Sequence, residues 1–280
     1  MIEYIKIIKP GIVIANMISV FSGFCYSQLS INFNLLFFVL LGSILLISSG
    51  CILNNIIDVD IDRKMSRTKH RLTTKVGFFF KLFFFLTGVL FFCISILIFF
   101  LKVNILCVFL SCIGFFFYVI LYSLFLKRQS IYSVFFGGIA GALPPVIGYC
   151  STKNSFDIKS ILLFLIFFVW QIPHSYSILL IYQKDYNIAQ IPNIVSEKGI
   201  SYTVFSILFY ILFFFILIVT FYKFYFTKSF LFILLFFFTI IWIVVSLFTL
   251  FSKIKINYFK YLFYCSVFII LIFDVCLIFS

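Results

Sequence analysis

The stretch SFLFILLFFFTIIWIVVSLFTLF, residues 229–251, contains 23 consecutive residues without a charged side chain. As an α-helix it would be about 35 Å long, enough to cross the roughly 30 Å hydrocarbon core of a bilayer. A helix that is apolar on every side has to be buried in protein or in lipid. The stretch therefore predicts a membrane-spanning helix.

The whole chain shares this character. Hydrophobic types make up 65% of its 280 residues, charged types make up only 10%, and 46 residues are Phe. A soluble domain is nearer half apolar and a quarter charged. The chain could not cover its own surface with polar groups, so most of that surface must face lipid, and a soluble domain is excluded.

Polar breaks divide the chain into apolar segments of spanning length. The break between the third and fourth segments consists only of Lys102 and Asn104, and no gap is long enough for a soluble domain. We predict an all-α membrane protein, one integral membrane domain over 1–280, with about nine helices. They are expected at 12–29, 35–55, 78–101, 103–125, 131–150, 159–182, 201–222, 229–251 and 259–279.

The net charge of +13 would suggest nucleic acid as the partner of a soluble protein. In a membrane protein, Lys and Arg instead collect in the cytoplasmic loops. With the N-terminus inside, 16 of the 21 basic residues fall on the inner side. We therefore predict a cytoplasmic N-terminus, an external C-terminus and no nucleic-acid partner.

The cysteines and the N-terminus carry no strong signal. None of the eight Cys residues forms a CxxC pair, so we interpret them as small buried hydrophobic residues and not as disulfides or metal ligands. The first apolar segment follows Lys9-Pro10-Gly11 without a convincing small-residue cleavage site. We expect no removable signal.

The segment NNIIDVDIDRKMSRTKHRL, residues 54–72, contains the most informative polar pattern. Asn54, Asp58 and Asp62 are spaced four apart, so on a helix they form one oxygen-bearing stripe. Like charges at this spacing repel each other, and a bound cation would offset the repulsion. An incomplete set of oxygen ligands suits Mg²⁺, which keeps waters and binds substrate phosphates. Asp60 is expected on the other side, paired with Lys64 or solvent.

Basic residues follow the acidic stripe at once. Arg63, Arg67 and Arg71 are again four apart, and Lys64 and Lys69 lie between them. Acid beside base at a membrane surface suits a metal-bridged polyphosphate, whose oxygens Arg binds through paired hydrogen bonds. The alternative is an ordinary basic cytoplasmic loop with incidental carboxylates.

A second polar segment covers residues 122–148. Lys127 and Arg128 end the fourth predicted helix on the inner side, where they bind an anion or merely set the topology. Pro144 and Pro145 should kink the fifth helix. Small residues in that helix allow close packing or leave room for a flat ligand; they are Gly137, Gly138, Gly141 and Ala142.

A third segment, residues 170–192, holds two titratable candidates. His174 follows Pro173 inside the membrane, where it is either an axial ligand of haem iron or a neutral His bonded across helices. Asp185 comes eleven residues later, about 16 Å along a helix. It is a ligand of a second metal, the other half of one site, or a loop charge. Because both acidic sites follow the second helix of a four-helix half, we expect two facing half-sites.

These segments resemble the intramembrane prenyltransferases of the UbiA superfamily, and more closely its haem-farnesylating branch. The resemblance runs from residue 9 to about 200. It lies in NNxxDxDIDRKMxRTxxR at 54–71, LKR at 126–128, GGxxGAxPPxxG at 137–148, WQxPH at 170–174 and DY at 185–186. The chain departs from the usual pattern at His70, Leu72, Ser175 and 189–195, and its last three helices match only in hydropathy.

The resemblance implies nine helices around a central cavity that opens sideways to lipid. It implies that Mg²⁺ is the cofactor and that His174 binds haem. The implied catalytic residues are Asp58, Asp62, Asp185 and Lys127. The implied metal ligands are Asn54, Asp58, Asp62 and Asp185. The implied diphosphate ligands are Arg63, Lys64, Arg67, Arg71, Lys127 and Arg128.

The implied reaction joins the farnesyl group of farnesyl diphosphate to a vinyl group of haem B, with addition of water, and gives haem O. Tyr118 and Tyr122 are expected to face the allylic cation. The implied setting is a bacterial inner membrane, with lipid and terminal-oxidase assembly as further partners. The alternatives are a prenyltransferase for a quinone precursor, which has no need of His174, a transporter or channel, and a structural subunit.

Overall fold

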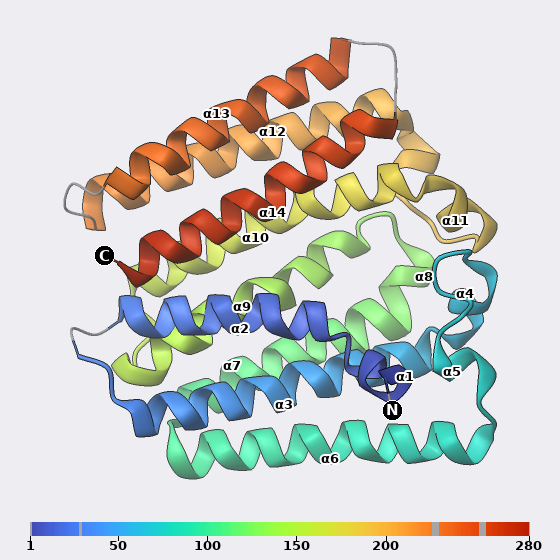
Figure 1. Cartoon of the computed structure of the whole chain (residues 1–280), viewed down its shortest axis with the longest axis horizontal. Helices are drawn as coiled ribbons and strands as arrows, with labels where there is room; N and C mark the ends of the chain where they lie inside the picture. Colours follow the sequence, from blue (N-terminus) through green and yellow to red (C-terminus); the bar gives the residue numbers. More distant parts are fainter. Residues whose placement is uncertain (1, 28–29, 226–229, 252–255, 280) are drawn as a thin grey trace.

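A computed structural model describes residues 2–27, 30–225, 230–251 and 256–279, with the side chains from residue 4 onward. The described chain is helical throughout, and its long helices run side by side (Figure 1). The ends of two predicted spans, residues 28–29 and 229, lie outside the described residues. So do three lysines that entered the topology argument, Lys228, Lys253 and Lys255.

Within the described residues, nine long helical stretches form the body of the molecule. They are α2 (Pro10–Tyr26), α3 (Phe33–Ile57), α6 (Phe78–Lys102), the run of α7 (Ile105–Phe115), η2 (Phe116–Leu126) and α8 (Lys127–Gln129), α9 (Ser133–Lys153), α10 (Ile158–Ile181), α12 (Ile194–Tyr225), α13 (Phe230–Phe251) and α14 (Ile256–Ile278). Short elements join them: α1 (Ile2–Ile5), η1 (Lys6–Ile8), α4 (Val59–Lys64), α5 (Leu72–Lys75) and α11 (Gln183–Ile188).

Eight of these stretches in the described chain are long and apolar enough to cross a bilayer, and α2 is a shorter apolar helix of 17 residues. Their outer faces expose large apolar side chains; Phe79 and Phe251 are each 83% exposed. Such surfaces are stable only against lipid. The chain is a multi-pass membrane protein, which confirms the prediction of an all-α fold with about nine helices.

The narrow break between the third and fourth predicted spans is confirmed. α6 ends at Lys102, and Asn104 caps α7 by accepting a hydrogen bond from the backbone of Cys107 at 2.8 Å. The same Asn104 amide donates to the carbonyl of Cys150 at 2.9 Å. One polar residue therefore both starts a helix and ties it to α9.

Helix α2 crosses α9 with the two backbones in close approach. A Cβ atom on Gly23 would lie 2.0 Å from the carbonyl oxygen of Pro145, and one on Gly148 would lie 2.0 Å from that of Val20. Only glycine fits at either position, as is common where membrane helices pack. α9 continues as one helix through Pro144 and Pro145.

The fourth span is not a regular α-helix. Its second half, η2, is a π-helix of 11 residues, where an uninterrupted helix was expected. Widened turns of this kind are frequent at functional sites. The cysteines are free as expected, although Cys93 and Cys112 are exposed and were wrongly interpreted as buried.

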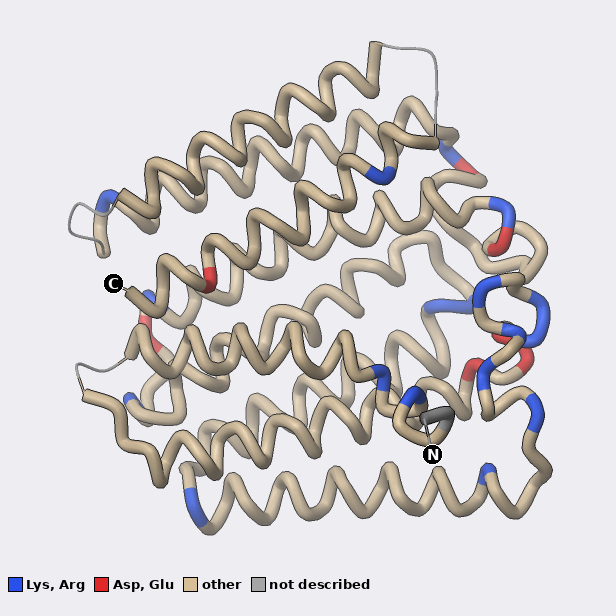
Figure 2. Tube along the Cα trace, viewed as in Figure 1, with Lys and Arg blue, Asp and Glu red and all other residues tan. Residues whose placement is uncertain are grey.

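Charged residues gather at one end of the helix bundle, where α4, α5, α8 and α11 lie (Figure 2). The N-terminus is at the same end. Segments from both halves of the chain meet there, and the two facing half-sites stay a prediction. This end holds the candidate site.

Candidate active site

The stripe of Asn54, Asp58 and Asp62 forms at the junction of α3 and α4. Asp58 is both the last cap of α3 and the first cap of α4. Its N–H still donates to the carbonyl of Asn54 at 2.9 Å, and its carbonyl accepts from the N–H of Asp62 at 2.7 Å. The helical spacing thus continues through the turn. All three residues are at most 4% exposed.

Cationic and hydroxyl groups from other helices meet the first half of the stripe. Lys127 Nζ lies 2.5 Å from Asp58 Oδ2, which also accepts from Asn54 Nδ2 at 2.9 Å. The same amide reaches Ser123 Oγ at 2.9 Å, and Lys9 donates to Asn54 Oδ1. The negative charge of Asp58 is therefore compensated by a lysine 69 residues away.

Asp62 is compensated separately. Arg71 Nη1 donates to Asp62 Oδ2 at 2.7 Å and to Asn55 Oδ1 at 3.1 Å. Asn55 in turn donates to the carbonyl of Ile7 at 2.7 Å. These bonds fix the arginine between the acidic stripe and the N-terminal segment.

The expectation for Asp60 was partly right, because its side chain is open to solvent but is not paired with Lys64. The residue is exposed, but both of its carboxylate oxygens accept from Arg128, at 2.5 and 2.8 Å. Arg128 also donates to the carbonyl of Ile57 at 2.8 Å. The hydrogen bond from this guanidinium lowers the pKa of Asp60 to about 2. Lys64 was the wrong partner because Arg128, remote in sequence, lies nearer.

The stripe has the donor chemistry for a divalent cation. Asp58 Oδ1 is buried and has no hydrogen-bond partner among the described residues, which leaves one carboxylate oxygen for a ligand. Three oxygen-bearing side chains and a free carboxylate oxygen fit Mg²⁺, which keeps waters and completes its shell with phosphates. The described residues contain no cluster of three His, Cys, Asp or Glu, and the role of Asn54 as a metal ligand stays a prediction.

Asp185 lies in the first turn of α11 and faces the loop after α4. Its Oδ1 accepts from Ser66 Oγ at 2.7 Å and from Ser66 N at 3.2 Å, and its Oδ2 accepts from Arg67 N at 3.2 Å. Burial raises the pKa of this carboxyl group, but the hydrogen bonds outweigh it and lower the pKa overall. Asp185 thus joins the two polar segments through the loop, and its role as a metal ligand stays a prediction.

The candidate diphosphate residues are spread over several surfaces. Arg67 lies over the ring of Tyr182 with its guanidinium carbon 4.7 Å from the centroid. Arg63 Nε donates to the carbonyl of Thr74 at 3.3 Å, and Lys64 is exposed. Only Lys127 lies on the wall of the cavity described next.

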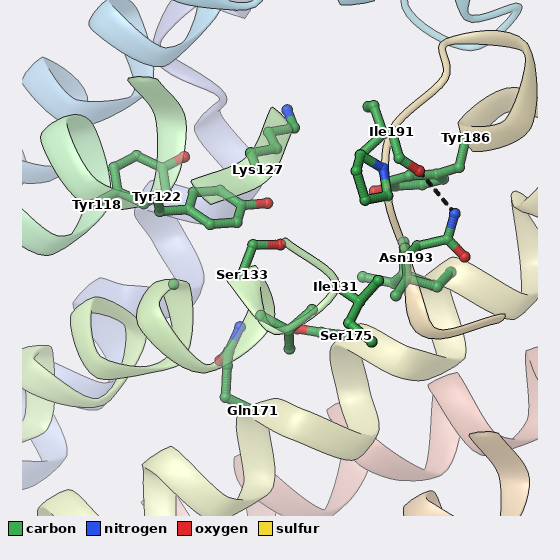
Figure 3. A pocket seen from close by; sticks show the side chains of 15 residues that line it. Tyr118, Tyr122, Lys127, Ile131, Ser133, Gln171, Ser175, Tyr186, Ile191 and Asn193 are labelled. Atoms are coloured by element: carbon green, nitrogen blue, oxygen red, sulfur yellow. Dashed lines mark hydrogen bonds between the residues drawn. The ribbon is translucent and has the colours of Figure 1, made fainter. Parts of the chain in front are cut away.

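A cavity of about 180 Å³ opens beside the stripe (Figure 3). Tyr118 and Tyr122 of η2 line it with their rings 6.0 Å apart, and Lys127 lies at the same wall. Gln171 and Ser175 of α10 lie around the same space. The remaining lining includes Ser133, Gly137, Ile178, Tyr186 and Asn193. The cavity is mostly apolar and reaches the lysine that contacts Asp58.

His174 lies on another face of α10. Its ring is 4.9 Å from Trp170 and 5.0 Å from Phe263 of α14, and its Nδ1 lies 2.8 Å from Ser266 Oγ. It is not among the residues that line the cavity, whereas Gln171 and Ser175 are. The structure therefore brings Lys127, the partner of Asp58, to the cavity and seats His174 against α14.

Sequence reasoning missed Lys9 and Ser123 at the stripe. Burial and the neighbouring Arg71 and Lys127 lower the pKa of Lys9 to about 8, against attraction from Cys51 and Asp58. The position of Lys9 directly before the first span was a visible signal, but a basic residue there is also explained by the rule that places Lys and Arg in cytoplasmic segments. Ser123 had no signal, because its position depends on η2, where it donates to the carbonyl of Tyr118 at 2.8 Å.

The chain belongs to the UbiA prenyltransferase family, whose model matches residues 16–267. Among similar proteins, the protoheme IX farnesyltransferase of Wigglesworthia glossinidia brevipalpis is 47% identical over 216 residues, 77% of this chain and 74% of that protein. That of Cronobacter sakazakii is 43% identical over 71% of this chain and 68% of its own.

Solved structures share the fold at low sequence identity. A digeranylgeranylglyceryl phosphate synthase matches with a TM-score of 0.79 at 16% identity, over 99% of this chain and 98% of its own. A UbiA homolog from Archaeoglobus fulgidus bound to GPP and Mg²⁺ matches with a TM-score of 0.68 at 14% identity, over 99% and 100%.

Proposed function

We propose that this chain, acting as one domain over 1–280, transfers the farnesyl group of farnesyl diphosphate to a vinyl group of haem B and produces haem O. The observation that carries this proposal is Asp58: it is buried, keeps one free carboxylate oxygen, and is paired with Lys127 at the wall of an apolar cavity. The similarity to protoheme IX farnesyltransferases supports the choice of haem as acceptor.

The first step breaks the bond between the allylic carbon and the diphosphate oxygen, and the electron pair leaves with diphosphate. Asn54, Asp58 and Asp62 would hold Mg²⁺, which supplies positive charge against the leaving oxygens. Lys127 and Arg71 neutralise further charge, because each already carries its ammonium or guanidinium group at the stripe. Asp185 would act from the loop side as the second acidic group.

The second step joins the farnesyl cation to the vinyl carbon inside the cavity. The parallel rings of Tyr118 and Tyr122 present π-faces to a cation, and apolar walls keep water away until the bond has formed. Water then adds to the cation beside the porphyrin and loses a proton, which gives the hydroxyl group of haem O.

The hydrogen bonds around His174 support its proposed role as the haem ligand. Ser266 Oγ donates its only proton to the carbonyl of Phe263 at 2.6 Å, so it accepts a hydrogen bond from His174 Nδ1–H. This tautomer leaves Nε2 with a lone pair, as an iron ligand requires.

Replacing His174 by Ala should shift the Soret band of bound haem B and lower haem farnesylation about a hundredfold. Ser266→Ala removes the fixed tautomer but keeps the ligand, so haem affinity should fall about tenfold with the band unchanged. The measurements are absorption spectra of purified protein and farnesylation rates. Unchanged spectrum and rate in His174→Ala would make His174 a packing residue.

The reaction itself is tested by incubating purified protein with haem B, Mg²⁺ and farnesyl diphosphate, followed by mass analysis of the pigment. We expect haem O, loss of the product with EDTA and recovery with added Mg²⁺. Prenylation of a quinone precursor in place of haem would overturn the choice of acceptor.

We further propose that the protein lies in a bacterial inner membrane, with the N-terminus and the charged end in the cytoplasm. The product would then be used in the assembly of a terminal oxidase.

A further inference from the structure

A second cavity, of about 300 Å³, lies at the charged end of the bundle. Its walls come from η1, the end of α3 and the segment from residue 67 to α5. Five of its lining residues are basic in type: Lys6, Arg67, His70, Arg71 and Lys75. None of the residues that line it is acidic. We call it the basic cavity.

The cations of the basic cavity are largely without counter-charges. The described residues form three ion pairs, which involve Arg71, Lys127 and Arg128. Lys6 and Lys75 therefore have no carboxylate partner within the described chain, and Arg67 meets Asp185 through its backbone N–H and not through an ion pair of its guanidinium group. Positive groups held together in this way repel one another, and a bound anion would relieve that repulsion.

Thr73 provides an independent sign of a ligand. It lines the basic cavity, is 1% exposed, and its hydroxyl oxygen has no hydrogen-bond partner among the described residues. An unpaired buried hydroxyl is costly, so such a group usually has a partner that is not part of the chain. The neighbouring Thr74, by contrast, donates to the carbonyls of Lys69 and Arg71.

The available donors select the kind of anion. Ammonium and guanidinium groups together with a hydroxyl group match the several acceptor oxygens of a phosphate. Tyr4 and Ile5, directly before Lys6, expose 52% and 51% of their surfaces, as residues at a lipid interface do. A phosphate at the membrane surface would therefore lie beside apolar chains.

We propose that the basic cavity binds a phosphate group, either in the headgroup of an anionic phospholipid or as free phosphate. The basic cavity is separate from the cavity of the proposed farnesyl transfer, because the two share no lining residue. Arg71 connects the two, since it lines the basic cavity and bonds Asp62. A phosphate there competes with Asp62 for the guanidinium group.

The test uses the full chain purified in a neutral detergent. Native mass spectrometry measures retention of phosphatidylglycerol against phosphatidylcholine, and titration calorimetry measures binding of inorganic phosphate. The variants are Lys6→Gln with Lys75→Gln, and Thr73→Val, which keeps the shape of the side chain but removes its hydroxyl. Lys69→Gln is the matched control, because Lys69 is exposed in the same loop and lines neither cavity.

A lysine beside an anionic group contributes roughly fivefold to affinity, so the double variant should lose about twentyfold. Thr73→Val should lose severalfold at unchanged thermal stability, and Lys69→Gln should bind normally. If only the binding of phosphatidylglycerol is weakened in this order among the variants, the ligand is a lipid headgroup. If only the binding of inorganic phosphate is weakened in this order, the ligand is free phosphate. Binding of neither probe, or equal binding by all variants, overturns the proposal.

Discussion

Replacing Asp58 by Asn should lower the rate of prenyl transfer by about a thousandfold, near the upper end for one lost electrostatic group. The change removes the negative charge that Lys127 neutralises and replaces one of the two carboxylate oxygens by an amide nitrogen, which does not bind Mg²⁺. Leaving-group stabilisation is lost while the helices stay in place. Initial rates measured over a range of Mg²⁺ concentrations check the effect.

Asp60→Asn is the matched control for this variant. It is the same substitution two residues further along, on an exposed side chain bonded to Arg128, and its rate should stay within about threefold of the wild type. A second variant, Asp58→Asn with Lys127→Met, separates catalysis from folding, because it no longer buries an unpaired cation. It should recover thermal stability but not activity. More than a tenth of wild-type activity in Asp58→Asn would refute the metal site.

Gly148→Ala should destabilise the protein by about 3 kcal/mol, the upper part of the range for overpacked cores. The added methyl group would lie 2.0 Å from the carbonyl oxygen of Val20, a backbone atom that cannot turn aside. α2 must then move away from α9. For a chain of this size the melting temperature in detergent should fall by about 10 °C.

Gly11→Ala is the control for the crossing of α2 and α9. Gly11 lies in α2 itself, and a Cβ atom there would meet nothing within 4 Å. Its melting temperature should equal that of the wild type or exceed it slightly, because Ala favours helix. Equal melting temperatures for Gly148→Ala and Gly11→Ala would show that the two helices do not approach so closely.

The spans could be read from the sequence because lipid imposes a simple rule: backbone polar groups must be paired within each segment, so a long apolar run becomes a helix. The predicted 78–101 and 159–182 are close to α6 and α10, Phe78–Lys102 and Ile158–Ile181. The stripe of Asn54, Asp58 and Asp62 was equally readable, since i, i+4 spacing is a local property. These features required no knowledge of neighbouring helices.

The partners of the stripe were decided only by the tertiary structure. Lys9, Ser123, Lys127 and Arg71 reach it from segments 9 to 69 residues away. Several basic residues at this end were equally available as partners, and which of them meets Asp60 depends on where α8 packs. Opposite charges attract regardless of their separation in sequence, so pairing follows spatial distance.

The tertiary structure also decided which side chains of η2 and α10 point toward the cavity and which pack against neighbouring helices. The π-helix turns Tyr118, Tyr122 and Lys127 toward one cavity, although nothing in their spacing marks a widened turn. On α10, polar residues lie on both sides of His174 in the sequence, Gln171 before it and Ser175 and Ser177 after it, so composition did not indicate which face would meet α14. Apolar periodicity orients a helix only where one side meets water. In lipid both sides are apolar, and close packing at glycines such as Gly23 and Gly148 settles which surfaces touch.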